Sequence, residues 1–132
     1  MKKEKSMSKH KDILDNFSDK FPILNRLYDL YTQTNEFAEK DEDTLRKSSE
    51  ITILEILELV VIASRQRKEE KIQTLRQAHR KLDILKVFSE MAKEIQAVTE
   101  KNYEEITENM ESVGRMIGGW LKAVTTPKTT EA

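Results

Sequence analysis

The chain has 132 residues, no cysteine and a formal net charge of −1. This length supports one domain with one hydrophobic core, and the lack of cysteine excludes disulfides and thiolate chemistry. The longest apolar stretch, Ile51 to Ile62, is interrupted by polar residues and is shorter than the roughly 18 residues of a membrane span. Membrane partners are therefore not expected, and because the N-terminal lysines precede no signal-type apolar segment, we expect a cytoplasmic protein.

The composition has few glycines and prolines and many Glu, Lys, Leu and Ile residues, which predicts an all-α protein. Residues 1–11 are expected to be a mobile basic tail. Apolar residues within 12–20 favour either a short N-terminal helix or an ordered arm. The helical domain is expected to span 12–124, and residues 125–132 are expected to form a polar tail.

The first main helix is predicted from about Pro22 to Glu39. Proline suits its first position, because the N–H that proline lacks would have no helical partner there. The joint that follows is polar and offers Asp43 or Thr44 as the N-cap of the next helix.

The second helix is predicted over roughly Leu45 to Ser64. Nine of the twelve residues from Ile51 to Ile62 are apolar, which exceeds what one amphipathic face requires. A helix of this kind is buried on more than one side, so we infer contact with another subunit.

The third helix is predicted from about Glu70 to Ile95, after a turn at Gln66–Glu69. Two neighbouring apolar stripes cover about half of its circumference at 100° per residue. One stripe is expected to enter the core and the other to contribute to an oligomer or partner interface. The first contains Leu75, Ala78, Leu82, Leu85, Ser89 and Ala92, and the second contains Ile84, Phe88, Met91 and Ile95.

The stretch 65–93 is basic, with nine bases against four acids. Its simplest interpretation is a solvated helix face. The alternative is a nucleic-acid-binding surface, because arginine suits bidentate contact with phosphate and an oligomer would repeat the patch. The candidate residues are Arg65, Arg67, Lys68, Lys71, Arg76, His79, Arg80 and Lys86.

The fourth helix is predicted to begin after Thr99 as N-cap and to end before Pro127. A heptad seam runs along it, yet all three glycines of the chain lie within it, at an expected cost of about 0.5–1 kcal/mol each. Either helices pack closely there inside the domain, or an oligomer or partner contacts the backbone. The candidate interface residues are Gly114, Gly118, Gly119 and Trp120.

Short joints between long helices predict an up-down-up-down four-helix bundle, and its excess apolar surface predicts a homo-oligomer. Bundles can house metals on Glu-x-x-His pairs, but His79 has Arg76 at the partner position. We find no zinc spacing, phosphate loop or nucleophile with a nearby base. We therefore expect no catalytic residues, metal or cofactor.

Three segments resemble the accessory variability (Avd) proteins of diversity-generating retroelements. Residues 114–122, Gly-Arg-Met-Ile-Gly-Gly-Trp-Leu-Lys, are similar to the C-terminal signature of that family. Residues 54–60 resemble its leucine-rich second helix, and 75–85 its Leu-Arg-x-Ala-x-Arg-Lys-Leu third helix. The resemblance covers about 51–123. Proteins encoded in intervening sequences of large ribosomal RNA genes share this fold.

The resemblance implies a four-helix bundle that assembles as a pentameric ring and has no catalytic site. It implies binding to a reverse transcriptase and to template RNA, or an RNA/DNA hybrid, in support of mutagenic reverse transcription. The basic surface of the family corresponds here to Arg76 and Arg80, and then to Arg65, Arg67, Lys68, Lys71 and Lys86. Because this chain is nearly neutral, the alternative is a scaffold of the same fold that binds proteins and no nucleic acid.

Overall fold

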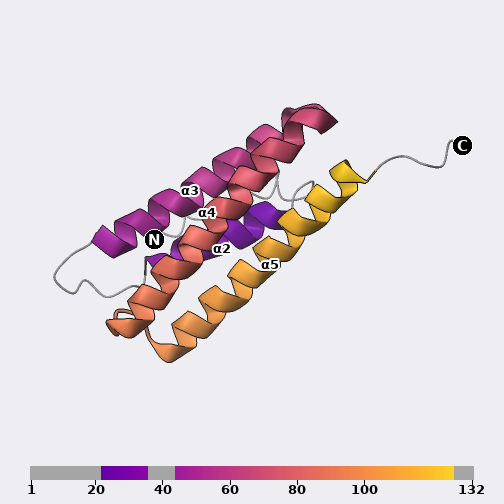
Figure 1. Cartoon of the computed structure of the whole chain (residues 1–132). Helices are drawn as coiled ribbons and strands as arrows, with labels where there is room; N and C mark the ends of the chain where they lie inside the picture. The colour runs from indigo at the N-terminus through magenta and orange to yellow at the C-terminus, as the bar shows by residue number, and fades with distance from the viewer. Residues whose placement is uncertain (1–21, 36–43, 127–132) are drawn as a thin grey trace, which may run out of the picture.

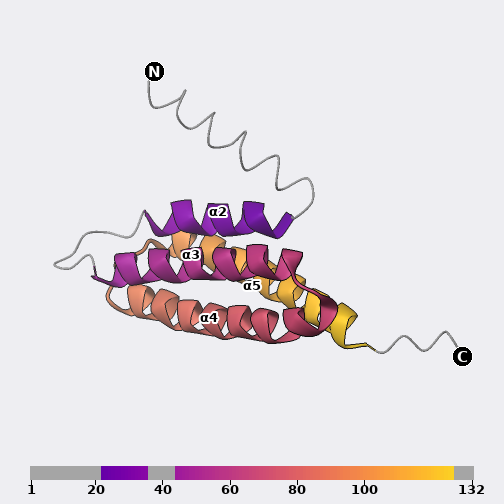
Figure 2. The same ribbon diagram turned by 90° about the horizontal axis from the view of Figure 1, so that it is seen from above.

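The computed structural model describes residues 22–35 and 44–126, and within them all regular structure is helical. Four helices pack together: α2 (Pro22–Thr34), α3 (Thr44–Arg65), α4 (Lys68–Glu94) and α5 (Glu100–Thr125) (Figure 1). Each helix packs against two of the others, and α2 lies across the bundle from α4 (Figure 2). Successive helices alternate in direction, so the predicted all-α bundle is confirmed for these residues.

Several helix boundaries differ from the predicted ones. α2 ends at Thr34 rather than near Glu39, and the buried Thr34 hydroxyl donates to the carbonyl of Tyr31 at 2.9 Å. α4 begins at Lys68, because the Glu70 carboxylate accepts from the backbone N–H of Arg67 at 3.1 Å and caps the helix there. The turn before it is therefore shorter than Gln66–Glu69.

The other two helices begin as the sequence indicates, to within one residue. Thr99 is the N-cap of α5, and its hydroxyl accepts from the N–H of Asn102 at 3.1 Å. Thr44 is already helical. The predictions for Asp43, for the tail over 1–11, for the helix or arm over 12–20 and for 127–132 lie outside the described residues.

One hydrophobic cluster fills the space between the four helices. The first α4 stripe is fully buried in it, including Ser89. The middle of the α5 seam is buried as well, whereas Tyr103, Trp120 and Val124 are half-buried. Burial of this apolar area at about 25 cal/mol per Å² is the main driving force for the bundle. The buried seam residues of α5 are Ile106, Met110, Val113 and Ile117.

The contact between α2 and α5 is partly polar. The Asn109 side chain donates to Gln33 Oε1 at 3.0 Å and accepts from Arg26 at 3.1 Å. Two helical turns away, Asn102 donates to the Gln33 carbonyl at 3.3 Å. Both asparagines are buried, so these bonds fix the register of α2 along α5.

The excess apolar surface is found on the outer side of the α3–α4 hairpin. Within this chain the second α4 stripe is largely exposed, and only Phe88 is half-buried. On one side of α3, Ile51, Leu54 and Ile62 are exposed as well. None of the described helices is long and apolar enough to cross a membrane. The exposed large side chains are Ile51, Leu54, Ile62, Ile84, Val87, Met91 and Ile95, each 41–57% exposed.

Candidate nucleic-acid and partner interface

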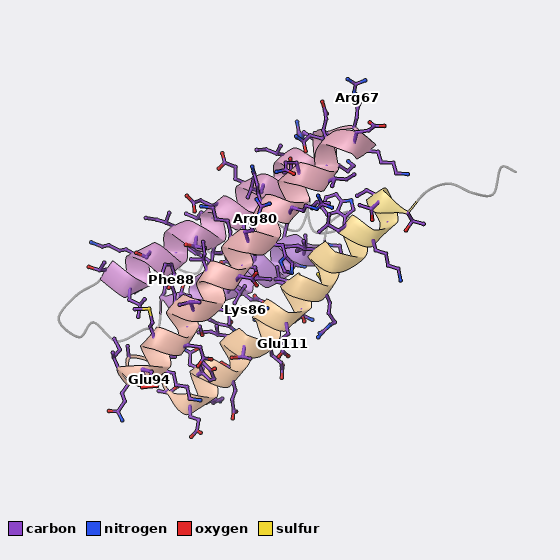
Figure 3. The ribbon with its side chains drawn as sticks, in the orientation of Figure 1. Arg67, Arg80, Lys86, Phe88, Glu94 and Glu111 are labelled. Atoms are coloured by element: carbon purple, nitrogen blue, oxygen red, sulfur yellow. The ribbon has the colours of Figure 1, made fainter. Side chains whose placement is uncertain are left out.

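A basic cluster lies at the end of the bundle where α3 ends and α4 begins. Arg65 and Arg67 are exposed there, and Lys68 is half-exposed. Figure 3 shows Arg67 at one end of α4 and Glu94 at the other. The antiparallel course of α5 brings its exposed Lys122 to the same end. Lys122 is not among the residues predicted from the sequence, although the pairing of α4 with α5 could have indicated it.

Lys71 belongs to the candidate set, but its ammonium group is occupied within the chain. It donates to the carbonyl oxygens of Ala63 at 2.7 Å and Gln66 at 2.8 Å, which close the C-terminal end of α3. It also lies 5.8 Å from the centre of the Trp120 ring. Lys71 therefore connects α3, α4 and α5, and its geometry is that of a helix C-cap.

The remaining candidates on α4 divide between two sides of the helix. Arg76 and Arg80 are exposed, and Arg80 also borders α3. His79 is half-exposed, with Nδ1 3.7 Å from Asp83. Lys86 faces α5 (Figure 3), whereas Arg80 lies on the α3 side of α4.

Lys86 lines a pocket of about 190 Å³ between α4 and α5. Tyr103 donates a hydrogen bond from its hydroxyl to Glu90, and this bond raises the pKa of the phenol above its ordinary value. Lys93 lies 4.5 Å from the centre of the Tyr103 ring. Glu90 and Glu111 line the same pocket as Lys86, so a phosphate bound there would meet both carboxylates.

A groove of about 490 Å³ runs between α3 and α4 on the outer side of the hairpin. Lys81 crosses it and lies 3.1 Å from Glu55. The groove combines apolar walls with side chains of both charge signs. Its lining residues are Glu55, Glu58, Leu59, Gln77, Arg80, Lys81 and Ile84.

The glycines of α5 have different surroundings. A Cβ on Gly114 would lie 3.4 Å from Leu82, an ordinary contact, so this position does face a neighbouring helix. Among the residues that the structure describes, a Cβ on Gly118 or Gly119 would meet nothing within 4 Å, and both glycines are exposed. Close packing inside the bundle is therefore wrong as the reason for these two glycines.

Charge is distributed unevenly along the bundle. Residues 100–112 of α5 hold five glutamates and one lysine, whereas 113–126 hold Arg115 and Lys122 and no acid. At the start of α4, residues 67–80 hold five bases and two acids, and 81–94 hold three of each. The basic half of both helices lies at the same end, so a polyanion is attracted to that end and repelled from the other.

The described residues contain no group of three or more His, Asp or Glu side chains placed to hold a metal ion. Comparison with known families decides what kind of bundle this is, because the family model of bAvd-like proteins matches residues 18–124. The chain belongs to the bAvd-like family. No curated protein and no solved structure matches it.

The bAvd-like match covers all four helices and includes the three segments that carried the resemblance, so the identification as an Avd-type protein is confirmed. Avd-type proteins are accessory proteins, which suggests an accessory role in a diversity-generating retroelement. In the bAvd-like chain the candidate surface consists of the basic end, the outer arginines of α4, the α3–α4 groove and the exposed glycines of α5.

Proposed function

We propose that this bAvd-like protein is a non-catalytic, cytoplasmic accessory subunit of a diversity-generating retroelement. It binds the reverse transcriptase and its template RNA, or the RNA/DNA hybrid, and supports mutagenic reverse transcription. The observation that carries the proposal is the family match over residues 18–124. The exposed arginines on the outer side of α4 and the basic end of the bundle support the RNA-binding part.

The RNA contacts are made through phosphate, because the exposed arginines and lysines present charged donors to the backbone of a polyanion. Arg76 and Arg80 contribute from α4, and Arg65, Arg67 and Lys68 from the end of the bundle. The glutamates of α5 oppose binding on the other half. Affinity for bare RNA is therefore modest, and it increases when the polymerase adds its own surface.

The subunit acts as a ring-shaped homo-oligomer, which repeats the basic end around the ring. The exposed apolar side chains of α3 and α4 supply the surface that assembly would bury. A count of five protomers rests on the Avd resemblance alone. Gel filtration with light scattering is expected to report about five protomers, and a monomer at micromolar concentration would exclude the ring.

One observation favours a second candidate function. The exposed face of α5 is strongly acidic over residues 100–112, which disfavours any nucleic acid there. A scaffold that binds the polymerase and no RNA would leave the basic end of the bundle solvated.

Co-purification separates the two functions. The chain is expressed with a retroelement reverse transcriptase and its template RNA, with and without ribonuclease. The accessory-subunit proposal expects both to be retained and expects DNA synthesis on the template to require the chain. Retention of polymerase alone supports the scaffold, and retention of neither overturns both.

A further inference from the structure

We propose that the α3–α4 groove of one copy receives the outer ridge of α5 from the next copy in the ring. The α5 ridge is defined here as Glu111, Arg115, Gly118 and Gly119, all of them exposed. This inference rests on the ring assembly of the proposed function and assigns its two contacting surfaces. It shares Arg80, which lines the groove, with the proposed RNA surface, so the tests below use other residues.

A ring requires two different surfaces on each protomer, whereas one self-complementary surface gives a closed pair. The outer side of the α3–α4 hairpin is the first surface, because it holds all the exposed large apolar side chains in the described ranges. No comparable apolar side chain is exposed on the described α2 or α5. The second surface must therefore accept apolar groups without presenting a matching apolar patch.

The two exposed glycines of α5 provide such a surface. Without a Cβ, the helix backbone at Gly118 and Gly119 is open to close approach from outside, and nothing in the described chain lies within 4 Å of an added Cβ. Each glycine costs about 0.5–1 kcal/mol relative to alanine in a helix interior. The bundle gains nothing from these two, and a neighbouring copy packed on the backbone would offset that cost.

The level of a residue is its position along the length of the bundle. These levels determine which residues of α5 lie opposite which residues of the neighbouring groove. We place the ring axis parallel to the helices, and rotation about such an axis keeps every residue at its own level along the bundle. Leu82 is level with Gly114, where an added Cβ would lie 3.4 Å away, and Lys81 is level with Glu55 at 3.1 Å. The α5 ridge of one copy therefore reaches the next copy at the level of its groove.

At that level the charges are complementary. Arg115 is next to Gly114, so it is level with Glu55 of the groove, and Glu58 lies about one helical turn further along α3, within reach of the long arginine side chain. Glu111 lies one helical turn away, within reach of Lys81. Opposite charges in both positions favour this pairing over other registers.

One turn beyond Arg115, the glycines come level with Leu59 and Gln77 of the groove. The half-buried Leu59 can then contact the bare backbone of the neighbouring α5. Gly118 and Gly119, which carry no side chain, thus lie opposite the apolar Leu59 of the groove.

The absence of cysteine permits a direct crosslinking test in the full chain. A Gln77→Cys variant and a Gly118→Cys variant are oxidised separately and as a mixture. We expect a disulfide-linked pair only in the mixture, because a disulfide requires Cβ atoms roughly 3.5–4.5 Å apart. The variant that carries both cysteines is expected to form a ladder that ends at the protomer count of the ring.

A matched control is Glu94→Cys, which is also exposed on α4 but lies 17 residues from Gln77, or about 25 Å along the helix. Mixed with Gly118→Cys, it is expected to give no linked pair. If Gln77→Cys links to itself, the hairpin surface is self-complementary and the inference is wrong. If light scattering reports a ring but no mixed disulfide forms, the groove–ridge contact is wrong and the ring assembly stands. If light scattering reports monomers, both the contact and the ring assembly are wrong.

A charge exchange provides a second, independent readout. Arg115→Glu and Glu58→Arg are each expected to weaken assembly at least about tenfold through like-charge contacts. The two changes together restore an opposite pair at every interface, so assembly is expected to return to within about threefold of wild type. Additive losses in the double variant would contradict the pairing. RNA and polymerase binding are measured separately, so a defect in either does not affect this test.

Discussion

The Lys71 ammonium lies 5.8 Å from the centre of the Trp120 ring while it donates to the carbonyls of Ala63 and Gln66. One side chain of α4 thereby closes the end of α3 and contacts the last turns of α5. This basic residue stabilises the end of the bundle, and its neighbours at that end remain exposed for a ligand.

The Lys71→Met variant is therefore expected to lower the free energy of unfolding by about 1–2 kcal/mol, because it removes two charge-assisted hydrogen bonds from a partly exposed site. Lys68→Met is the matched control, since Lys68 makes no such bonds, and it is expected to stay within about 0.5 kcal/mol of wild type. Urea denaturation followed by circular dichroism provides both values. Equal stability of the two variants would show that the Lys71 interactions contribute nothing.

Substitutions at Gly118 separate protomer stability from assembly. Gly118→Leu is not expected to overpack the bundle, because nothing in the described chain lies within 4 Å of an added Cβ. The variant is expected to keep its helical content and to fail to assemble. Gly118→Ala is expected to stabilise the protomer by up to about 1 kcal/mol. Circular dichroism and light scattering test both, and a Gly118→Leu variant that assembles like wild type would exclude a contact at this position.

Tyr103 makes stability depend on pH in the alkaline range. Its hydrogen bond to Glu90 raises the pKa of the phenol in the folded state above the ordinary value near 10. The unfolded chain therefore loses this proton first, and the contribution of Tyr103, fully present below about pH 10, is lost as the pH rises through the folded pKa. In Tyr103→Phe, the free energy of unfolding is expected to fall less than in wild type as the pH rises above about 10. Urea midpoints at pH 8 and above pH 10 check it, and identical pH profiles of variant and wild type would contradict it.

The regular parts of the fold could be predicted from sequence periodicity. The first α4 stripe and the middle of the α5 seam are buried because three- and four-residue spacing places them on one helix face. Helix starts are harder to predict where a side chain decides them, as Glu70 does at the start of α4. Propensity does not reveal which carboxylate turns back to cap the backbone.

The candidate site is harder to predict than the fold, because it depends on which helices are neighbours. Lys71 and Arg76 are both basic residues of α4, and only the packing of Trp120 and the end of α3 shows that Lys71 is occupied. Likewise, the exposure of Gly118 follows from the position of α5 relative to the other described helices. Spacing along one helix gives the face of a residue but not what lies opposite to it.

RNA binding by the outer side of α4 is the central claim of the proposed function. Filter binding is measured over a salt series for wild type, for Arg76→Glu with Arg80→Glu, and for Lys93→Glu with Lys101→Glu as a control of equal charge change. All four residues are exposed, so circular dichroism is expected to show an intact bundle in each variant. Because Arg80 also lines the α3–α4 groove, light scattering measures assembly in each variant, and RNA affinities are compared only between assembled samples.

The arginine variant is expected to bind RNA at least about tenfold more weakly, with a salt slope shallower by about 0.7 for each phosphate that it no longer neutralises. The lysine control is expected to stay within about twofold of wild type, because it lies on the acidic half of the bundle where phosphate is repelled. If the folded, assembled arginine variant binds RNA as wild type does, the α4 surface is only a solvated face, and the protein-only scaffold replaces the accessory subunit that binds RNA.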